Sequence, residues 1–285
     1  MDRLAQELID IIIYNLHDSP SDLHECSLVC RSWLPACQRH LFRCIILGPK
    51  PYFHLRSDLS SSERLYQALL GSPHLANYIK GLKVYEGLAV REQDWIAEDQ
   101  TLPLVLRMLG KLEMIELRCL PWSDLTLYSK QSLCRVFQLP SMRFVEIERD
   151  SFDKMEDFLS LLDHARGLTG LSFYDTKQKH YLLAQGGEDD QDEQRLYLHM
   201  PRYLSDLRLA LYDNTTFINW LLGHRSHSKN VSHIHTLHML IIHQTCGNAI
   251  NQLLRAIGSS LKHFRLHMRI KSVYPLAILE AECDI

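Results

Sequence analysis

The chain has no excess of basic residues and no long apolar run. Its 31 lysines and arginines are balanced by 34 aspartates and glutamates, which gives a formal net charge of −3. Nucleic-acid binding depends on a basic surface, so this balance argues against nucleic acid as the main partner. No apolar run approaches the ~18 residues of a membrane span, and the N-terminus lacks the basic stretch of a signal peptide. We therefore expect a soluble protein of the cytoplasm, the nucleus or both, without a membrane partner.

Motifs that carry enzyme chemistry are also lacking. The 12 glycines form no phosphate-binding loop, and the chain has neither a nucleophile elbow nor a metalloprotease helix. These absences predict no cofactor, no catalytic residues and no enzymatic activity. A cysteine and a histidine that are distant in sequence can still meet in space as a catalytic pair, and the sequence leaves that open.

Paired cysteines are missing as well. The eight cysteines, at positions 26, 30, 37, 44, 119, 134, 246 and 283, include no C-x-x-C pair, so we expect free thiols. Cys26 and Cys30 are one helical turn apart, but no second ligand pair follows them, which argues against zinc. Histidines gather between residues 224 and 243 without a carboxylate at helical ligand spacing. We expect no metal there and interpret His235 and His238 as exposed residues of a pH-sensitive recognition patch.

The chain does have a strongly apolar N-terminal segment, residues 4–44. The apolar residues within positions 8–16 cover more than half of a helix, a wider surface than the stripe of an ordinary surface helix. Ser19 and Pro20 suit the N-cap and first turn of a second helix that runs to about residue 31, and Ser32 suits the cap of a third. Roughly 40 residues of helix can bury little surface by themselves, so this surplus of apolar side chains indicates docking.

This segment resembles the F-box. The family pattern begins Leu-Pro-x-Glu-Leu, has an Asp-Leu pair opening the second helix and ends on Val-Cys-(Arg/Lys)-x-Trp. The chain departs from it at Ala5, where the family usually has proline, and this departure implies somewhat weaker docking. The residues that match in order, spacing and type are Leu4, Glu7, Leu8, Ile9, Ile12, Leu16, Asp22, Leu23, Cys26, Leu28, Val29, Cys30, Arg31 and Trp33.

The resemblance implies that residues 1–44 form a three-helix F-box domain. In that family the domain docks on the small adaptor subunit of SCF-type cullin–RING ubiquitin ligases. The adaptor-binding residues that the resemblance implies are Leu4, Leu8, Ile9, Ile12, Leu16, Leu23, Cys26, Val29, Cys30 and Trp33.

A second pattern begins at about residue 64. A unit of the form apolar-x-x-apolar-x-apolar recurs at intervals of 26 to 36 residues, close to the range of leucine-rich repeats. Segments with helical periodicity lie between the units, at residues 63–70, 102–109, 129–137, 155–164, 217–222 and 249–257. The units are Ile79/Leu82/Val84, Leu112/Ile115/Leu117, Met142/Val145/Ile147, Leu168/Leu171/Phe173, Leu204/Leu207/Leu209, Ile234/Leu237/Met239 and Leu261/Phe264/Leu266.

One strand and one helix per unit, with all strands in the same sense, predicts an α/β fold. We expect an N-terminal three-helix F-box followed by a curved, leucine-rich-repeat-like solenoid with a parallel sheet. The arrangement resembles the large fungal families of F-box proteins, although the asparagine that closes the leucine-rich repeat turn is absent. An ordinary α/β sandwich is the alternative. We assign residues 45–63 to a connecting segment and 64–285 to the repeat domain, and Cys44–Leu47 is a candidate first strand that would join the two parts rigidly.

In such a solenoid, the residues between and just after the last two core positions project from the concave face. Their charges predict an acidic region at the second and third repeats and a basic region at the last three. Solvated sheet residues without a partner are the alternative. The acidic residues 186–193 predict a mobile surface loop, and residues 195–200 predict a short extra strand. The predicted target-binding residues are Lys83, Tyr85, Glu116, Arg118, Glu146, Glu148, Tyr174, Arg208, His238, Arg265 and His267.

Taken together, these patterns favour a substrate-recognition subunit of an SCF-type ubiquitin ligase. The F-box would bind the adaptor, and the repeats would hold an unknown protein substrate. Two alternatives stay open from the sequence: an F-box protein that acts as a scaffold without promoting ubiquitination, and an enzyme unrelated to ubiquitin.

Overall fold

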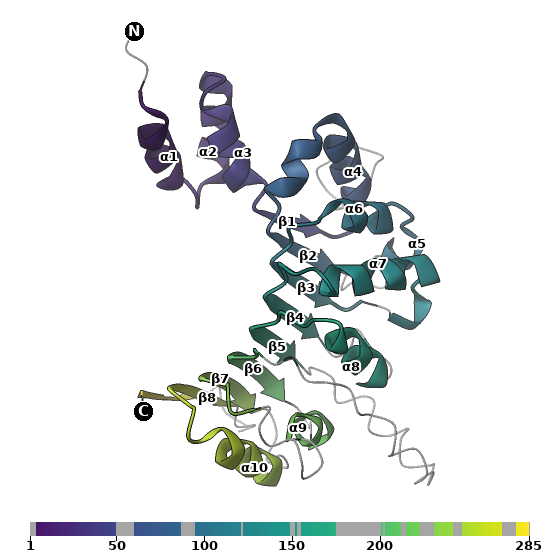
Figure 1. The fold of residues 1–285 in the computed structure, drawn as a ribbon, viewed down its shortest axis with the longest axis vertical. Helices are drawn as coiled ribbons and strands as arrows, with labels where there is room; N and C mark the ends of the chain where they lie inside the picture. The colour runs from purple at the N-terminus through teal and green to yellow at the C-terminus, as the bar shows by residue number, and fades with distance from the viewer. Residues whose placement is uncertain are drawn as a thin grey trace.

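The structure, a computed structural model, describes residues 4–49, 60–86, 95–120, 122–148, 152, 155–174, 201, 203–211, 215–222, 231–241, 247–269 and 278–284. It is an α/β fold in which one sheet carries helices on one of its faces and a group of three helices precedes the first strand (Figure 1). Within these ranges, none of the helices combines the length and the apolar character that crossing a membrane requires.

The N-terminal group consists of α1 (Gln6–Tyr14), α2 (Pro20–Val29) and α3 (Leu34–Leu41). The three predicted helices are therefore confirmed, as are the positions of Ser19 at the N-cap and Pro20 in the first turn of α2, whereas Ser32 as the cap of α3 is wrong. Ser19 precedes α2 without a capping hydrogen bond from its side chain, and the residue that precedes α3 is Trp33. The hydroxyl of Ser32 instead lies 3.0 Å from the Cys30 sulfur, which removes it from the helix end.

Across the described ranges, the sheet has nine strands whose spatial order is their chain order. The first eight pair in parallel, and the ninth runs antiparallel to the eighth. The predicted first strand is confirmed: it follows α3 after two residues and pairs with the second strand. The sequence did not predict the antiparallel ninth strand. The strands are β1 (Cys44–Leu47), β2 (Gly81–Tyr85), β3 (Met114–Arg118), β4 (Phe144–Glu148), β5 (Gly170–Tyr174), β6 (Asp206–Leu211), β7 (Thr236–Ile241), β8 (His263–Arg269) and β9 (Ile278–Asp284).

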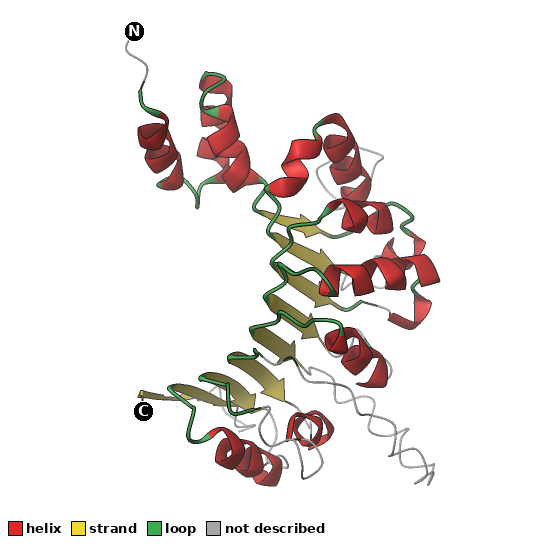
Figure 2. Ribbon diagram, in the orientation of Figure 1, coloured by secondary structure: helices red, strands yellow, loops and turns green. Residues whose placement is uncertain are grey.

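Helices connect the parallel strands and lie on one side of the sheet (Figure 2). Each of the six segments predicted to be helical contains a helix, whereas α5 and the two short 3-10 turns were too short to show a period. The helices are α4 (Ser61–Gly71), α5 (Trp95–Glu98), α6 (Leu102–Met108), α7 (Leu127–Phe137), α8 (Met155–Asp163), α9 (Thr215–Leu222) and α10 (Gly247–Ile257), with 3-10 turns η1 (Pro73–Asn77) and η2 (Trp122–Asp124).

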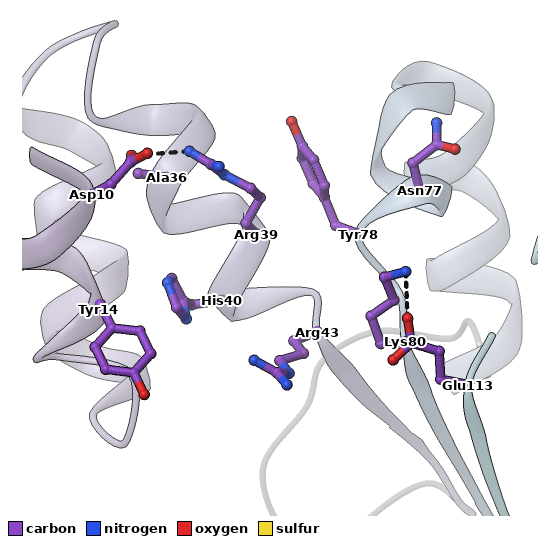
Figure 3. Close-up of a pocket in the computed structure, with 10 residues that line it drawn as sticks. All are labelled: Asp10, Tyr14, Ala36, Arg39, His40, Arg43, Asn77, Tyr78, Lys80 and Glu113. Carbon is purple, nitrogen blue, oxygen red and sulfur yellow. Dashed lines mark hydrogen bonds and ion pairs between the residues drawn. The ribbon is translucent and has the colours of Figure 1, made fainter. Parts of the chain in front are cut away.

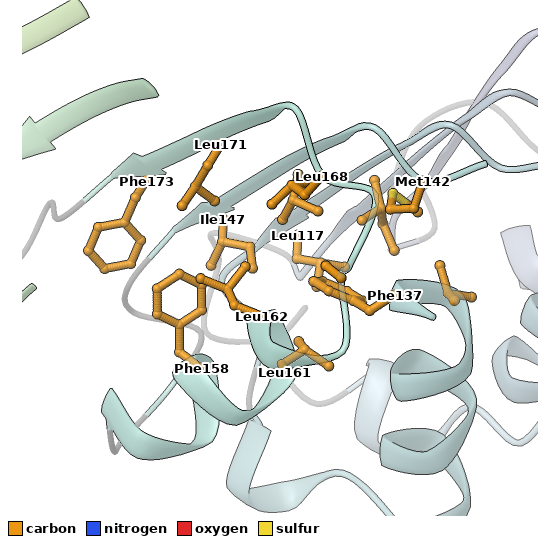
Figure 4. Close-up of a cluster of buried hydrophobic side chains, with 14 of the residues drawn as sticks. Leu117, Phe137, Met142, Ile147, Phe158, Leu161, Leu162, Leu168, Leu171 and Phe173 are labelled. Carbon is orange, nitrogen blue, oxygen red and sulfur yellow. The ribbon is translucent and has the colours of Figure 1, made fainter. Parts of the chain in front are cut away.

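The recurring apolar triplets form the core between sheet and helices. In the first six units all three positions are at most 2% exposed, and in the seventh Leu261 is buried while Phe264 and Leu266 are partly buried. The register places equivalent residues side by side, so that Leu82, Ile115 and Val145 form one continuous row. Each such side chain gains about 1.5–3 kcal/mol from burial. Figure 4 shows this layer, with Phe158 of α8 stacked 4.8 Å from Phe173 of β5.

Some expectations fall outside the described residues. These are the acidic loop at 186–193, the short strand at 195–200, and His224, His227 and His243 of the histidine cluster.

Candidate functional site

The first helix presents an uncovered apolar face. Leu8, Ile11 and Ile12 of α1 have the i, i+3, i+4 spacing of one helical face and are 50%, 58% and 39% exposed, and Leu4, just before the helix, is 52% exposed. The opposite face of α1 inserts Ile9 into the small core of the helical group. The helix is therefore apolar on two sides, and only one of them is buried.

The turn from α2 to α3 adds to this exposed apolar surface. Leu28, Val29 and Leu34 are 74%, 65% and 37% exposed. This turn lies at the same end of the helical group as the start of α1, which is the end remote from the sheet (Figure 2). Exposed apolar side chains gathered on one small unit mark an interaction site more often than scattered surface residues do.

The structure divides the predicted adaptor-binding residues into two sets. Leu4, Leu8, Ile12, Val29 and Cys30 are exposed. Ile9 and Leu23 are buried in the small core, and Leu16, Cys26 and Trp33 pack against it, so these five brace the exposed set. The sequence prediction omitted three exposed apolar residues that belong beside the first set: Ile11, Leu28 and Leu34.

The second candidate surface is the sheet face that no α-helix covers in Figure 2, which we call the open face. It carries the strand residues that alternate with the core positions. The parallel register aligns its central row from β2 to β8, and all predicted target-binding residues of that row lie side by side on it. The central row is Lys83, Glu116, Glu146, Ser172, Arg208, His238 and Arg265.

A chain of alternating charges occupies the open face over β2, β3 and β4. Glu116 at its centre is only 1% exposed and lies 2.7 Å from the Lys83 ammonium and 2.6 Å from Arg118 Nε. The Tyr85 hydroxyl donates to Glu116 at 3.0 Å, and Arg118 Nη2 reaches Glu146 at 2.9 Å. Burial of an ionised carboxylate costs free energy unless it is paired and hydrogen-bonded, and here three donors meet that requirement.

The same contacts alter the ionisation of the neighbours. The hydrogen bond that Lys83 donates to Glu116 raises the pKa of Lys83 above its ordinary value. Burial, and then the hydrogen bond to Glu116, raises the pKa of Tyr85. Both groups therefore remain protonated donors. Within the predicted acidic region at the second and third repeats, Lys83 and Arg118 thus pair with the carboxylates of Glu116 and Glu146.

Gly170 and Ser172 of β5 are small, so they form a low strip on the open face. Gly170 leaves room for the Phe144 ring of β4, since a Cβ at Gly170 would collide with Phe144 Cδ2. The Arg208 guanidinium of β6 lies 5.3 Å from the centre of that ring, so it spans the strip. Asp206 holds the same guanidinium at 3.0 and 3.2 Å. Sequence reasoning missed both Phe144 and Asp206, although their alternation with core positions was visible.

Basic residues follow on β7 and β8. Burial, and then the charge of Arg208, lowers the pKa of His238. The backbone register of β9 sets Glu282 opposite Arg265 and Glu280 opposite His267. His235 does not belong to the open face as predicted: it precedes β7, and its ring Nδ1 lies 3.0 Å from the Ser260 carbonyl.

In the described ranges, histidine, cysteine and carboxylate side chains form no group of three suited to a metal ion. The arrangement instead offers one apolar surface and one polar, largely self-paired surface, both of which suit contact with a macromolecule. The sequence matches no model of a known protein family, and no curated protein matches it either.

Proposed function

We propose that the protein is an F-box substrate receptor, in which α1–α3 dock on the adaptor of an SCF-type ubiquitin ligase and the open face holds a target protein. The exposed apolar surface of the helical group carries this proposal. Five residues form the buried core of that group, whereas seven large aliphatic residues in its described part remain at least 37% exposed. A half-exposed leucine or isoleucine leaves about 1 kcal/mol of burial free energy unrealised, which a docked partner would recover.

We also propose that the repeat part is a leucine-rich-repeat-like solenoid, with the open face on its concave side. Its support is one buried triplet, one parallel strand and one helical connection per unit, in strict chain order. Helices are about 10 Å wide while paired strands are only about 4.8 Å apart. A helical layer on one face alone therefore takes more width than the strands, which bends the array around the sheet.

The open face suits a polypeptide target. Charged side chains, Tyr85, Tyr174 and Phe144 interleave on it, and aromatic and arginine side chains are the ones that dominate protein interfaces. Burial, and then the charge of Glu146, raises the pKa of Tyr174, so its hydroxyl stays a hydrogen-bond donor. The proposed role supplies proximity between target and ligase, and it requires no catalytic residue in this chain.

Substitution of Leu8 tests the docking proposal. A charge at Leu8 would be buried unpaired on the adaptor, so L8E should abolish co-elution with purified adaptor in size-exclusion chromatography. The matched control is L70E on α4, because Leu70 is 52% exposed against 50% for Leu8. Co-elution of L8E at the wild-type ratio would contradict the proposal. Co-purification of the wild-type chain with adaptor but without cullin would favour the scaffold alternative.

Charge reversal on the open face tests target binding. Proximity labelling with the intact chain, compared with L8E, would first supply a target. The double variant R208E/R265E should then keep its fold and its adaptor binding while losing that target. Arg135 of α7 and Arg255 of α10 are exposed arginines on the helical side, and R135E/R255E is the matched control. Unchanged target capture by R208E/R265E would place recognition elsewhere on the chain.

A further inference from the structure

A hollow of about 510 Å³ lies where the helical group meets the sheet. Figure 3 shows Tyr14, Arg39 and His40 from α1 and α3 on one side, Tyr78 and Lys80 on the other, and Arg43 between them. A neighbouring hollow of about 400 Å³ shares Arg43, His40 and Lys80 with it. The two hollows together form one recess at the junction.

The charges around this recess do not cancel. Asp10 is paired with Arg39 Nη2 at 3.0 Å, and Glu113 is paired with Lys80 Nζ at 2.7 Å. Arg43 lines both hollows and has no ion-pair partner among the residues that the structure describes. Three fully charged cations therefore face two carboxylates, and the surplus positive charge belongs to Arg43.

The position of Arg43 is fixed by the sheet. Its carbonyl accepts hydrogen bonds from the backbone N–H groups of Lys80 and Gly81, both at 2.9 Å. The residue thus sits between α3 and β1 with its backbone anchored to the start of β2. This anchors the backbone of Arg43 and leaves its exposed guanidinium, a planar fork of N–H donors that matches the oxygens of a phosphate, at the recess.

Neutral groups complete the lining. Tyr14 and Tyr78 add aromatic walls with hydroxyl groups, and Ala36 adds a buried apolar wall. Burial, and then the charge of Arg43, lowers the pKa of His40. The volume exceeds what inorganic phosphate alone would fill and lies in the range of small-molecule sites.

We propose that this recess binds a small organic phosphate, with Arg43 as its main phosphate ligand and the two tyrosines around the organic part. Its walls come from both the helical group and the sheet, so a bound molecule would brace the angle between the proposed adaptor-binding and target-binding surfaces. Binding itself needs neither partner, and its test is therefore independent of the proposed function.

Isothermal titration calorimetry of the full chain with inorganic pyrophosphate tests this site, with sulfate at matched ionic strength as the comparison anion. The wild-type chain should bind pyrophosphate saturably at one site. R43Q should bind at least tenfold more weakly, while the control R135Q, on α7 away from the recess, should bind within about twofold of wild type.

Three results would overturn the proposal: no saturable binding by the wild-type chain, equal binding of sulfate, or unchanged affinity in R43Q. Circular dichroism would establish that R43Q is folded. If it is not, R43K keeps the charge, loses the guanidinium fork and should still weaken binding at least threefold; unchanged affinity in R43K would then count against the site.

Discussion

The buried carboxylate of Glu116 offers a sharp test of what holds the open face together. The chain contains a matched comparison, because Glu113 lies just before β3 and Glu116 lies within it. Each is paired with a lysine at 2.7 Å, Lys80 and Lys83 respectively. They differ in burial: the Glu113 side chain is 47% exposed and that of Glu116 is 1% exposed. Replacement of each by glutamine keeps the shape and removes only the charge.

The expected magnitudes follow from this difference. An exposed ion pair contributes about 0–1 kcal/mol, so E113Q should be nearly neutral. Loss of one partner of a buried pair costs about 3–5 kcal/mol, because the remaining charge is left uncompensated. At Glu116 the cations left behind, Lys83 and Arg118, are 31% and 49% exposed and regain some solvation. We therefore expect E116Q to lower the free energy of unfolding by about 2–4 kcal/mol, between the two limits.

Urea denaturation followed by tryptophan fluorescence would measure both variants against wild type. At roughly 2–4 °C per kcal/mol, E116Q should also lower the melting temperature by about 4–16 °C. Equal destabilisation by E116Q and E113Q would refute the reasoning, since burial would then make no difference to the pair. A stabilised E116Q would mean that desolvation of the carboxylate outweighs its three hydrogen bonds.

Two further predictions concern the other half of the open face. G170A should destabilise the fold by about 1–3 kcal/mol in urea titrations, because the new Cβ displaces the Phe144 ring. G71A is the control and should be nearly neutral, because no neighbouring side chain lies within 4 Å of its added Cβ. The pKa of His238 is lowered in the folded protein, so the unfolded chain binds a proton at a higher pH than the folded chain does. The stability that neutral His238 contributes should therefore be complete above pH 6.5 and decline as the pH falls below that value. The urea midpoint should accordingly fall between pH 7.5 and pH 5.5, and it should fall by less in H238N than in wild type.

The repeat was predictable because buried positions require apolar residues, and these form a visible pattern in the sequence. Leu117 and Ile147 must both be apolar to face the helices, and their spacing to Ile115 and Val145 follows from the two-residue period of a strand. Seven copies of this apolar pattern were enough to predict the strands, the register and the helical connections. The β9 strand lacks this pattern, because it pairs with β8 and contains none of the apolar triplets of the repeat.

The ends of the N-terminal helices were less predictable for a local reason. Ser32 has the right chemistry for an N-cap, but its hydroxyl has a competing contact with the Cys30 sulfur two residues away. Thr126, by contrast, does cap α7 by accepting from the Ser129 N–H at 3.1 Å. Capping requires the hydroxyl oxygen to accept a hydrogen bond from a backbone N–H of the first turn. The sequence shows that a hydroxyl is present but not which group it contacts.

The open face shows why charge counted along a sequence does not predict an electrostatic surface. Glu116 and Glu146 are consecutive members of one row, and by themselves they indicate an acidic patch. In the fold, Arg118 is bonded to both of them, and Lys83 from the neighbouring strand takes the remaining oxygen of Glu116. These carboxylates and cations are therefore paired with one another, and a charged target would have to break buried ion pairs in order to bind them. Recognition by charge should therefore depend on the β6–β8 half, where Arg208 is 44% exposed and pairs with Asp206 of its own strand. The reversal of Arg208 and Arg265 is for this reason the more informative test of target binding.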